Sequence, residues 1–359
     1  MKKRGLIYLI LATILFSSME VAIKATNGAF NPIQLNFLRF IIAGVVLLPM
    51  AIGKLKRENH KIDLKDIKDF ALMGFFCVVV SLSFYIISLL YVPAYEVAIL
   101  FSSNTFFSII LASIFLREKI SKQSMLALFI AFLGMLIIVD PFTFKGSFTG
   151  VILCIISAFT FSIYSVFSKY LTTGRPTGGT VMTCFAFIFG SIQLFILMMI
   201  SHIPSVSGFL IAHKLNVLAN IPYFSGITSD NLLLFLFISI GVTGIGFASY
   251  FLAIDTLSVA MGSIVFFVKP VLSPIISYFC IGEIISTKNE IGLAAIMVGS
   301  VILFIYNMKN IKHVSDIEEL PDVILEDIKE SAKDMKEEIK KDVEADIELL
   351  EDLNNEDRL

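Results

Sequence analysis

The sequence predicts an all-α integral membrane protein, in which ten transmembrane helices form two inverted five-helix repeats and both termini face the cytoplasm. Three observations support this fold class: an apolar composition, ten apolar stretches of membrane-spanning length, and a match between the two halves. Hydrophobic residues make up 57% of the chain and charged residues 16%. A soluble domain is about half apolar and a quarter charged, so we expect lipid to surround most of this chain.

Crossing a bilayer core as a helix takes about 20 apolar residues. The first such stretch follows three basic residues, as in a signal peptide, but its length, its Glu20 and the nine later stretches favour an uncleaved first span. The ten predicted spans are residues 5–24, 32–52, 69–91, 94–116, 123–140, 148–170, 180–201, 231–254, 259–281 and 288–307.

Lys and Arg predict the orientation, because they are retained on the cytoplasmic side of short connections. With the N-terminus inside, sixteen Lys and Arg residues fall on the inner side and four on the outer side. We therefore expect both termini in the cytoplasm, and a multi-pass protein of the cytoplasmic membrane.

The two halves match without gaps over two stretches, which predicts an internal repeat. Five spans per half is an odd number, so the second repeat must enter from the opposite side of the membrane, as in many secondary transporters. The alternative is a chance match between two apolar halves. The expected divisions are a first repeat over 1–144, a second over 145–308 and a tail over 309–359. The matched residues are Gly5, Phe16, Ser17, Val21 and Lys24 with Gly150, Phe161, Ser162, Val166 and Lys169, and Tyr85, Phe101, Ser108, Glu118 and Gly134 with Tyr250, Phe266, Ser273, Glu283 and Gly299.

Four motifs stand out: the stretch FSSMEVAIKATNGAFNPIQLNFLRF from Phe16 to Phe40, the span ends IFLREK and CIGEII, and the P-V-L-S-P run from Pro270 to Pro274. Together they resemble the EamA-like branch of the drug/metabolite transporter superfamily. Two residues depart from the family pattern: Phe16 stands where Trp is common, and Thr105 where the first half usually has a proline that matches Pro270.

The resemblance covers residues 5 to 307. It implies a bundle of ten helices that carries small organic solutes, often amino acids or related metabolites, across the cytoplasmic membrane. Membership does not fix the substrate.

Lys269 lies at the middle of the ninth predicted span, where a charge costs roughly 2.5 to 3.5 kcal/mol on insertion scales. The helical period places Phe266 and Ser273 on its face, together with Gly262 and Ser277. The repeat places Asn104 of the fourth span near the equivalent position. We expect both faces to line one cavity and to bind a solute.

The first span carries a polar stripe that includes Ser17 and Glu20, and Arg39 lies at similar depth in the second span. Glu20, Arg39 and Lys269 together carry one positive charge in excess. A substrate carboxylate is one group that could balance it, and Lys269 is the expected partner.

Each candidate residue also has a structural interpretation. Lys269 could form an ion pair with Glu20, and Glu20 could carry a proton or neutralise Arg39. Arg39 fits a packing or gating ion pair better than a ligand. Tyr85 and Tyr250 could offer hydroxyls to a solute or act as core aromatics.

Two further features concern the backbone and the span ends. Pro270 and Pro274 predict a kink in the ninth span, which could serve gating or packing. Glu118 and Glu283 are expected to orient turns at the ends of their spans.

The sequence lacks the motifs of other functional classes, such as enzymes and ATP-driven pumps. All four His residues fall outside or at the edge of the predicted spans, which argues against a membrane zinc site or a catalytic dyad. No P-loop is present in the sequence. We expect no enzyme, no cofactor and no nucleic-acid partner, but a secondary transporter that works by alternating access, with export favoured over uptake and a homodimer left open.

The C-terminal segment from Ser315 to Leu359 carries 18 acidic and six basic residues. Apolar residues at three- and four-residue steps suggest an amphipathic helix after Pro321. We expect a solvated, partly disordered acidic extension, and a coiled-coil or regulatory contact with the basic inner loop from Lys54 to Lys68 is the alternative. A membrane sensor or scaffold that signals through this tail is the rival function.

Overall fold

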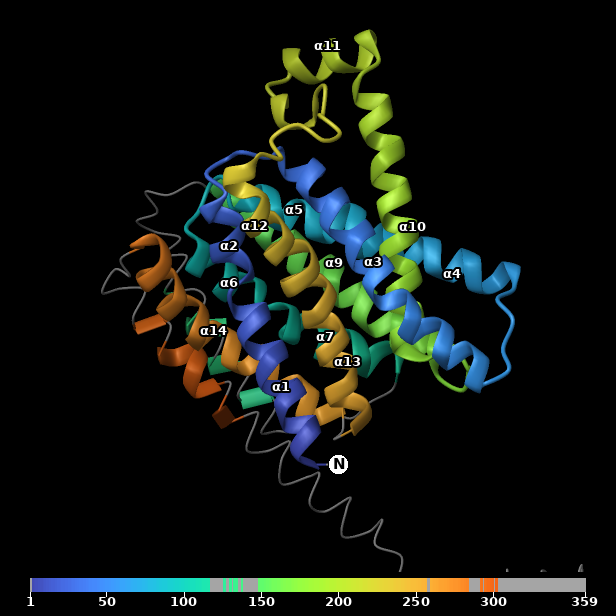
Figure 1. Ribbon diagram of the computed structural model, residues 1–359. Helices are drawn as coiled ribbons and strands as arrows, with labels where there is room; N and C mark the ends of the chain where they lie inside the picture. Colours follow the sequence, from blue (N-terminus) through green and yellow to red (C-terminus); the bar gives the residue numbers. More distant parts are fainter. Residues whose placement is uncertain are drawn as a thin grey trace, which may run out of the picture. The chain divides into compact units, whose positions relative to one another are not determined.

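The structure is a computed structural model that describes residues 2–116, 148–256 and 259–283, with short helical stretches between 125 and 137 and between 291 and 302. Every regular element described in the first half is helical (Figure 1). The elements of this half are α1 (Lys2–Ser17), α2 (Met19–Ala25), α3 (Pro32–Arg57), α4 (Leu64–Gly74), the π-helical segment η1 (Phe75–Ser81), α5 (Leu82–Ser88), α6 (Ala94–Phe101) and α7 (Asn104–Phe115).

The second half begins with two long helices and ends, in its described part, with another. The elements are α9 (Phe148–Thr172), α10 (Gly178–Ser201), α11 (Pro204–Ala212), the 3-10 turn η2 (Asn216–Leu218), α12 (Ser229–Leu236), the π-helical segment η3 (Phe237–Ile245), α13 (Gly246–Thr256) and α14 (Val259–Ile281).

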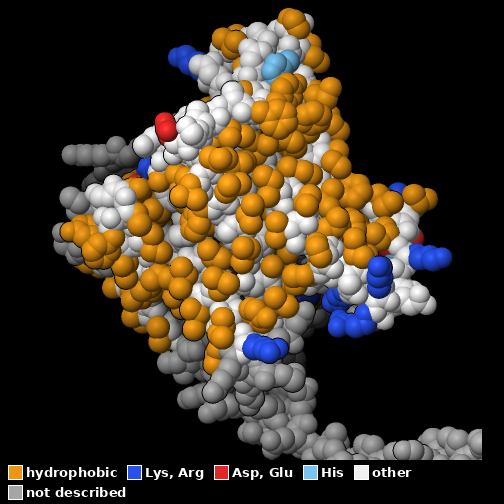
Figure 2. Space-filling model, viewed as in Figure 1, with side chains coloured by type: hydrophobic (Ala, Val, Ile, Leu, Met, Phe, Trp, Pro, Cys, Tyr) orange, Lys and Arg blue, Asp and Glu red, His pale blue; other side chains and the backbone are white. Residues whose placement is uncertain are grey.

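Seven stretches of the described residues are long and apolar enough to cross a membrane, and each coincides with a predicted span. α14 carries the ninth predicted span. The fifth and tenth predicted spans fall mostly outside the described residues, as does the acidic tail. Apolar side chains cover most of the face seen in Figure 2, and the protein is thus a multi-pass membrane protein, as the composition predicts.

The helices pack closely where small residues allow it. α3 lies along α10, and α1 packs against α13 and α14 (Figure 1). A Cβ atom added at Gly74 would lie 2.5 Å from the carbonyl oxygen of Ala186, and one at Gly190 would lie 2.7 Å from the carbonyl oxygen of Gly74. These glycines therefore set the distance between the third span and α10.

π-Helical segments interrupt the third span of each predicted half. They are rare in proteins and are frequent at functional sites. In η1 the carbonyl of Val78 accepts hydrogen bonds from Ser83 and from Asn36 of α3. In η3, Thr243 donates to the carbonyl of Ile238. Polar side chains thus donate hydrogen bonds to backbone carbonyls at both irregular segments.

At one end of the molecule, here called the α11 end, the α2–α3 connection meets the loop that follows α11. Asn31 caps α3 and donates to the carbonyl of Val217, and Gln34 donates to the carbonyl of Ser225. The capping box of Asn31 and Gln34, with Pro32 at the first helical position, explains why α3 begins here.

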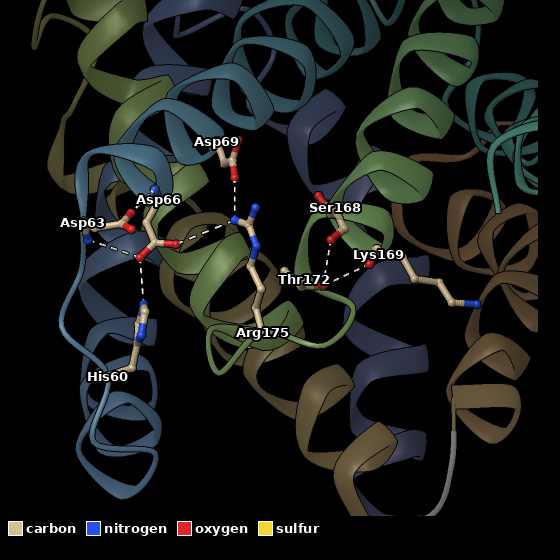
Figure 3. A network of polar contacts seen from close by, with 8 residues as sticks. All are labelled: His60, Asp63, Asp66, Asp69, Ser168, Lys169, Thr172 and Arg175. Atoms are coloured by element: carbon tan, nitrogen blue, oxygen red, sulfur yellow. Dashed lines mark hydrogen bonds and ion pairs between the residues drawn. The ribbon is translucent and has the colours of Figure 1, made fainter.

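At the other end, the α3–α4 connection meets the α9–α10 connection (Figure 3). Arg175 donates to Asp69 at 2.7 Å and lies 3.9 Å from Asp66, which also contacts the His60 ring nitrogen at 2.7 Å. Asp63 caps α4, and the hydrogen bond that its carboxyl accepts from the backbone N–H of Asp66 lowers the pKa of Asp63. Basic residues gather at this end, around the α3–α4 connection (Figure 2).

Candidate functional site

A buried ion pair joins the first and ninth spans. The Nζ atom of Lys269 in α14 lies 2.7 Å from Oε1 of Glu20 in α2, and both side chains are almost wholly inaccessible to solvent. The hydroxyl of Tyr85 in α5 donates to the same oxygen. Of the interpretations that the sequence leaves open, the ion pair between Lys269 and Glu20 is the one that the structure contains.

Two aromatic rings surround the ammonium group of this pair. The Nζ atom of Lys269 lies 5.7 Å from the ring centroid of Tyr85 and 5.6 Å from that of Phe101. Both distances are within the range of a cation–π interaction. The charge of Lys269 is therefore held by one carboxylate oxygen and two ring faces from three different spans.

Three buried polar atoms near this pair in sequence have no hydrogen-bond partner among the described residues. They are Oε2 of Glu20, Oγ of Ser17 and Oγ of Ser273. Ser17 precedes Glu20 by one helical turn, and Ser273 follows Lys269 by one turn. Buried polar groups are nearly always hydrogen-bonded, so each of these atoms has hydrogen-bonding capacity that the described residues leave unused.

Arg39 lies on α3 and is fully buried. Its Nε and Nη2 atoms donate to Oδ1 of Asn36 at 3.1 and 3.0 Å, and its Nη1 atom lies 3.4 Å from the sulfur of Met19. No ion pair with a carboxylate involves Arg39 among the described residues. Arg39 is therefore a buried cation without a carboxylate in ion-pair contact among the described residues, although Glu20 attracts it from a greater distance.

The remaining predicted residues lie in α7, α13 and α14, or have side chains outside the description. Asn104 begins α7, and its backbone carbonyl accepts from Ser162. Tyr250 packs against Phe16, with ring centroids 6.0 Å apart. α14 continues as a helix through Pro270 and Pro274, so the prolines do not end it. The side chain of Phe266 lies outside the described residues.

A second cluster consists of Lys24, Glu283, Ser277 and the N-terminus of α6. It is here called the outer clasp, after the side on which the predicted orientation would place it. Lys24 Nζ lies 3.0 Å from Glu283 Oε1, and the backbone N–H of Ala94 donates to the same carboxylate at 3.0 and 3.1 Å. Ser277 donates to Glu283 Oε2, and Lys24 also donates to the carbonyl of Val92 at 3.1 Å. Burial alone would raise the pKa of Glu283, but the bonds from Ser277, Ala94 and Lys24 outweigh it and lower the pKa.

A sequence model of the EamA-like transporter family matches residues 3–140 and again residues 148–305. The chain belongs to the EamA-like transporter family.

Proteins similar to this EamA-like chain are described as transporters. An uncharacterized transporter of Clostridium kluyveri is 31% identical over 86% of this chain and 95% of its own length. A riboflavin transporter of Brucella anthropi is 28% identical over 44% of this chain and 54% of its own length. One crystal structure matches with a TM-score of 0.56 at 17% identity, over 84% of this chain and 97% of that one, which shows a shared fold.

Sequence reasoning missed the outer clasp of this EamA-like protein. Glu283 was expected to orient a turn, whereas it binds the end of the first span and the start of the fourth. A usable signal exists, because Lys24 and Glu283 each match an identical residue in the other half of the sequence. Asn36 was also missed as the residue that holds Arg39.

Proposed function

We propose that this protein is a secondary transporter that moves a small organic metabolite across the cytoplasmic membrane by alternating access. The observation that carries the proposal is the buried pair of Glu20 and Lys269. Among the described residues, one Glu20 oxygen and the hydroxyls of Ser17 and Ser273, each one helical turn away in sequence, have no hydrogen-bond partner. Charged groups are placed in a bilayer interior at a large cost and are typical of solute or ion pathways. Substrate sites of many secondary transporters lie near the midplane.

The proposed architecture has two inverted repeats. Two findings support it. The family model matches the chain twice. π-Helical segments occur in the third span of each half, and the residues of η1 shifted by 165 positions overlap those of η3. The distribution of Lys and Arg supports cytoplasmic termini.

With this orientation, the outer clasp closes the extracellular side. It connects the end of the first span to the start of the fourth span in one half and to the end of the ninth span in the other. Opening the site to the outside requires these contacts to separate, because they join elements of both repeats. The network of Arg175 and Asp69 joins connections from both halves at the opposite end.

The proposed substrate is a small organic molecule with a polar group, an amino acid or a related metabolite, and export is the favoured direction. The description of one relative as a riboflavin transporter supports an organic solute rather than an inorganic ion. Glu20 is the proposed coupling residue, since it is a buried carboxylate within contact of both Lys269 and Tyr85.

Solute flux tests the proposal against a sensor that acts through the acidic tail. The purified full-length protein is reconstituted in liposomes and incubated with an extract of small metabolites, and the lumen is analysed by mass spectrometry. A transporter enriches at least one metabolite over protein-free liposomes. If no metabolite is enriched in either direction across the membrane, the transporter proposal fails and the sensor remains.

A further inference from the structure

Arg39 carries a charge that the described residues do not balance. It is a fully buried cation in the membrane part of the described chain, and its neighbours within hydrogen-bond distance are the amide of Asn36 and the thioether of Met19, both neutral. The other buried cation in that part, Lys269, is paired with Glu20. Glu20 attracts Arg39 only from beyond ion-pair distance. A buried charge without an ion-pair partner is strongly destabilising, so an anion in contact with Arg39 would be stabilising.

The guanidinium group also has hydrogen-bonding capacity left. Its five N–H donors form a planar fork, and the hydrogen bonds of the described residues use three of them. Asn36 Oδ1 occupies the side formed by Nε and Nη2. One N–H on Nη1 and one on Nη2 remain, and two such donors match the two oxygens of a carboxylate.

Asn36 fixes the direction of this fork. Its amide nitrogen donates to the carbonyl of Val78 in η1 at 2.8 Å and to Ser83 at 3.1 Å. These bonds turn Oδ1 toward Arg39. The face of Arg39 is further held by the ring of Phe40, whose centroid lies 4.5 Å from the guanidinium carbon. The fork is therefore oriented before any ligand arrives, which lowers the cost of binding.

Met19 contacts the Nη1 side of the guanidinium group, which Asn36 leaves open. Its sulfur is 3.4 Å from Nη1, and a thioether is a weak acceptor on a flexible side chain. Met19 immediately precedes Glu20 in α2. A carboxylate can replace this contact at small cost, because it offers a stronger acceptor than the sulfur.

We propose that Arg39 is the anion-binding residue of the transport site and that the transported solute carries a carboxylate, which displaces Met19 from the guanidinium group. This inference rests on the proposed function and narrows its substrate class. Lys269, by contrast, keeps Glu20 as its partner. The three charges of Glu20, Lys269 and Arg39 then require one negative charge from the solute.

Matched acids and amides test the inference by thermal stabilisation, because a ligand that binds the native state raises its apparent stability. The probes are lactate with lactamide, benzoate with benzamide, and N-acetylalanine with its amide, at constant ionic strength. We expect at least one acid, and not its amide, to raise the melting temperature of the wild type. In Arg39→Gln and Arg39→Lys the acid concentration at half-maximal shift should rise about tenfold or more, since hydrogen bonds to charged groups are lost.

Arg57→Gln is the matched control, because Arg57 lies on the same helix with an exposed side chain. It should keep the full response to acids. A wild type that responds equally to acids and amides, or to no acid, overturns the inference. So does an Arg39→Gln variant with the wild-type response. The proposed transport function fails separately, when no solute of any charge crosses the membrane.

A second pair of variants leaves Arg39 in place. Met19→Glu puts a carboxylate at the position of the sulfur, and Met19→Gln puts a neutral group of the same shape there. We expect Met19→Glu to fold and to lose the response to acids, because its own carboxylate occupies the fork, while Met19→Gln keeps the response. Equal responses of the two variants would overturn the inference even if the Arg39 variants did not fold.

Discussion

The Nζ atom of Lys24 lies 3.0 Å from Oε1 of Glu283, although 259 positions separate the two residues in the sequence. The same carboxylate accepts hydrogen bonds from the backbone of Ala94 at the N-terminus of α6, where a negative charge is favoured by the helix dipole. Glu283 thus holds together the end of the first span, the start of the fourth and the end of the ninth.

Glu283→Gln should loosen the outer clasp, because it removes the charge that binds both Lys24 and the α6 N-terminus. The measurement is the labelling rate of a cysteine at Ser273 by a membrane-impermeant maleimide, in a background where the exposed Cys280 is replaced by serine. We expect labelling several times faster than with the clasp intact. Glu58→Gln, which removes an exposed ion pair at the opposite end, should leave the rate unchanged.

The clasp should withstand mild acid. The pKa of Glu283 is below its ordinary value of 4.5, because bonds from Ser277, Ala94 and Lys24 outweigh the effect of burial. A lowered folded-state pKa gives stability that is present above the ordinary pKa and is lost as the pH falls through the folded-state value. The melting temperature of the wild type should therefore exceed that of Glu283→Gln by a constant amount from pH 7 to about pH 5. A difference that already vanishes near pH 6 would contradict this assignment.

Replacing one member of the buried pair should lower the free energy of unfolding more than replacing both members. Lys269→Met leaves the Glu20 carboxylate without its cation, and loss of one partner of a buried pair costs about 3–5 kcal/mol. The double variant Glu20→Gln, Lys269→Met has no buried charge left at this position, and we expect it to recover much of the loss. Thermal unfolding in detergent compares the two. Equal losses in both variants would mean that the pair is not coupled.

Gly74→Ala should destabilise the bundle by roughly 1–3 kcal/mol, because the added methyl group meets backbone atoms of α10 that cannot move away cheaply. The control is Gly53→Ala in α3, whose added Cβ has no atom within 4 Å. That change should stabilise by about 0.5–1 kcal/mol, since alanine favours a helix interior over glycine. Similar effects of the two substitutions on the melting temperature would argue against the close packing.

Most of the helical layout could be predicted from the sequence, because the thickness of the bilayer sets the length of each apolar stretch. Seven predicted spans coincide with described helices, and the predicted and observed ends differ by only a few residues. The π-helical segments could not be predicted, because the residues from Phe75 to Ser81 show no proline or other local breaker. Their irregular carbonyls are occupied by side chains from elsewhere, such as Asn36, and depend on tertiary packing.

The site was predicted in part. The depth of Lys269, Glu20 and Arg39 identified them as residues that need partners, but depth along a helix does not say which helices face each other. The pairing of Lys269 with Glu20 follows from the packing of α14 against α2 and of α5 near both. The outer clasp was missed for the same reason, since it joins three span ends whose proximity only the fold determines.

The most direct test asks whether the Glu20 and Lys269 pair lies on the solute path. The measurement is uptake into proteoliposomes of a metabolite that the wild type accumulates in the flux assay. The wild type is compared with the double variant Glu20→Gln, Lys269→Met, and thermal unfolding confirms equal amounts of folded protein. We predict that the double variant is folded and accumulates no more metabolite than protein-free liposomes. Uptake by the double variant at the wild-type rate would contradict a transport site at this pair.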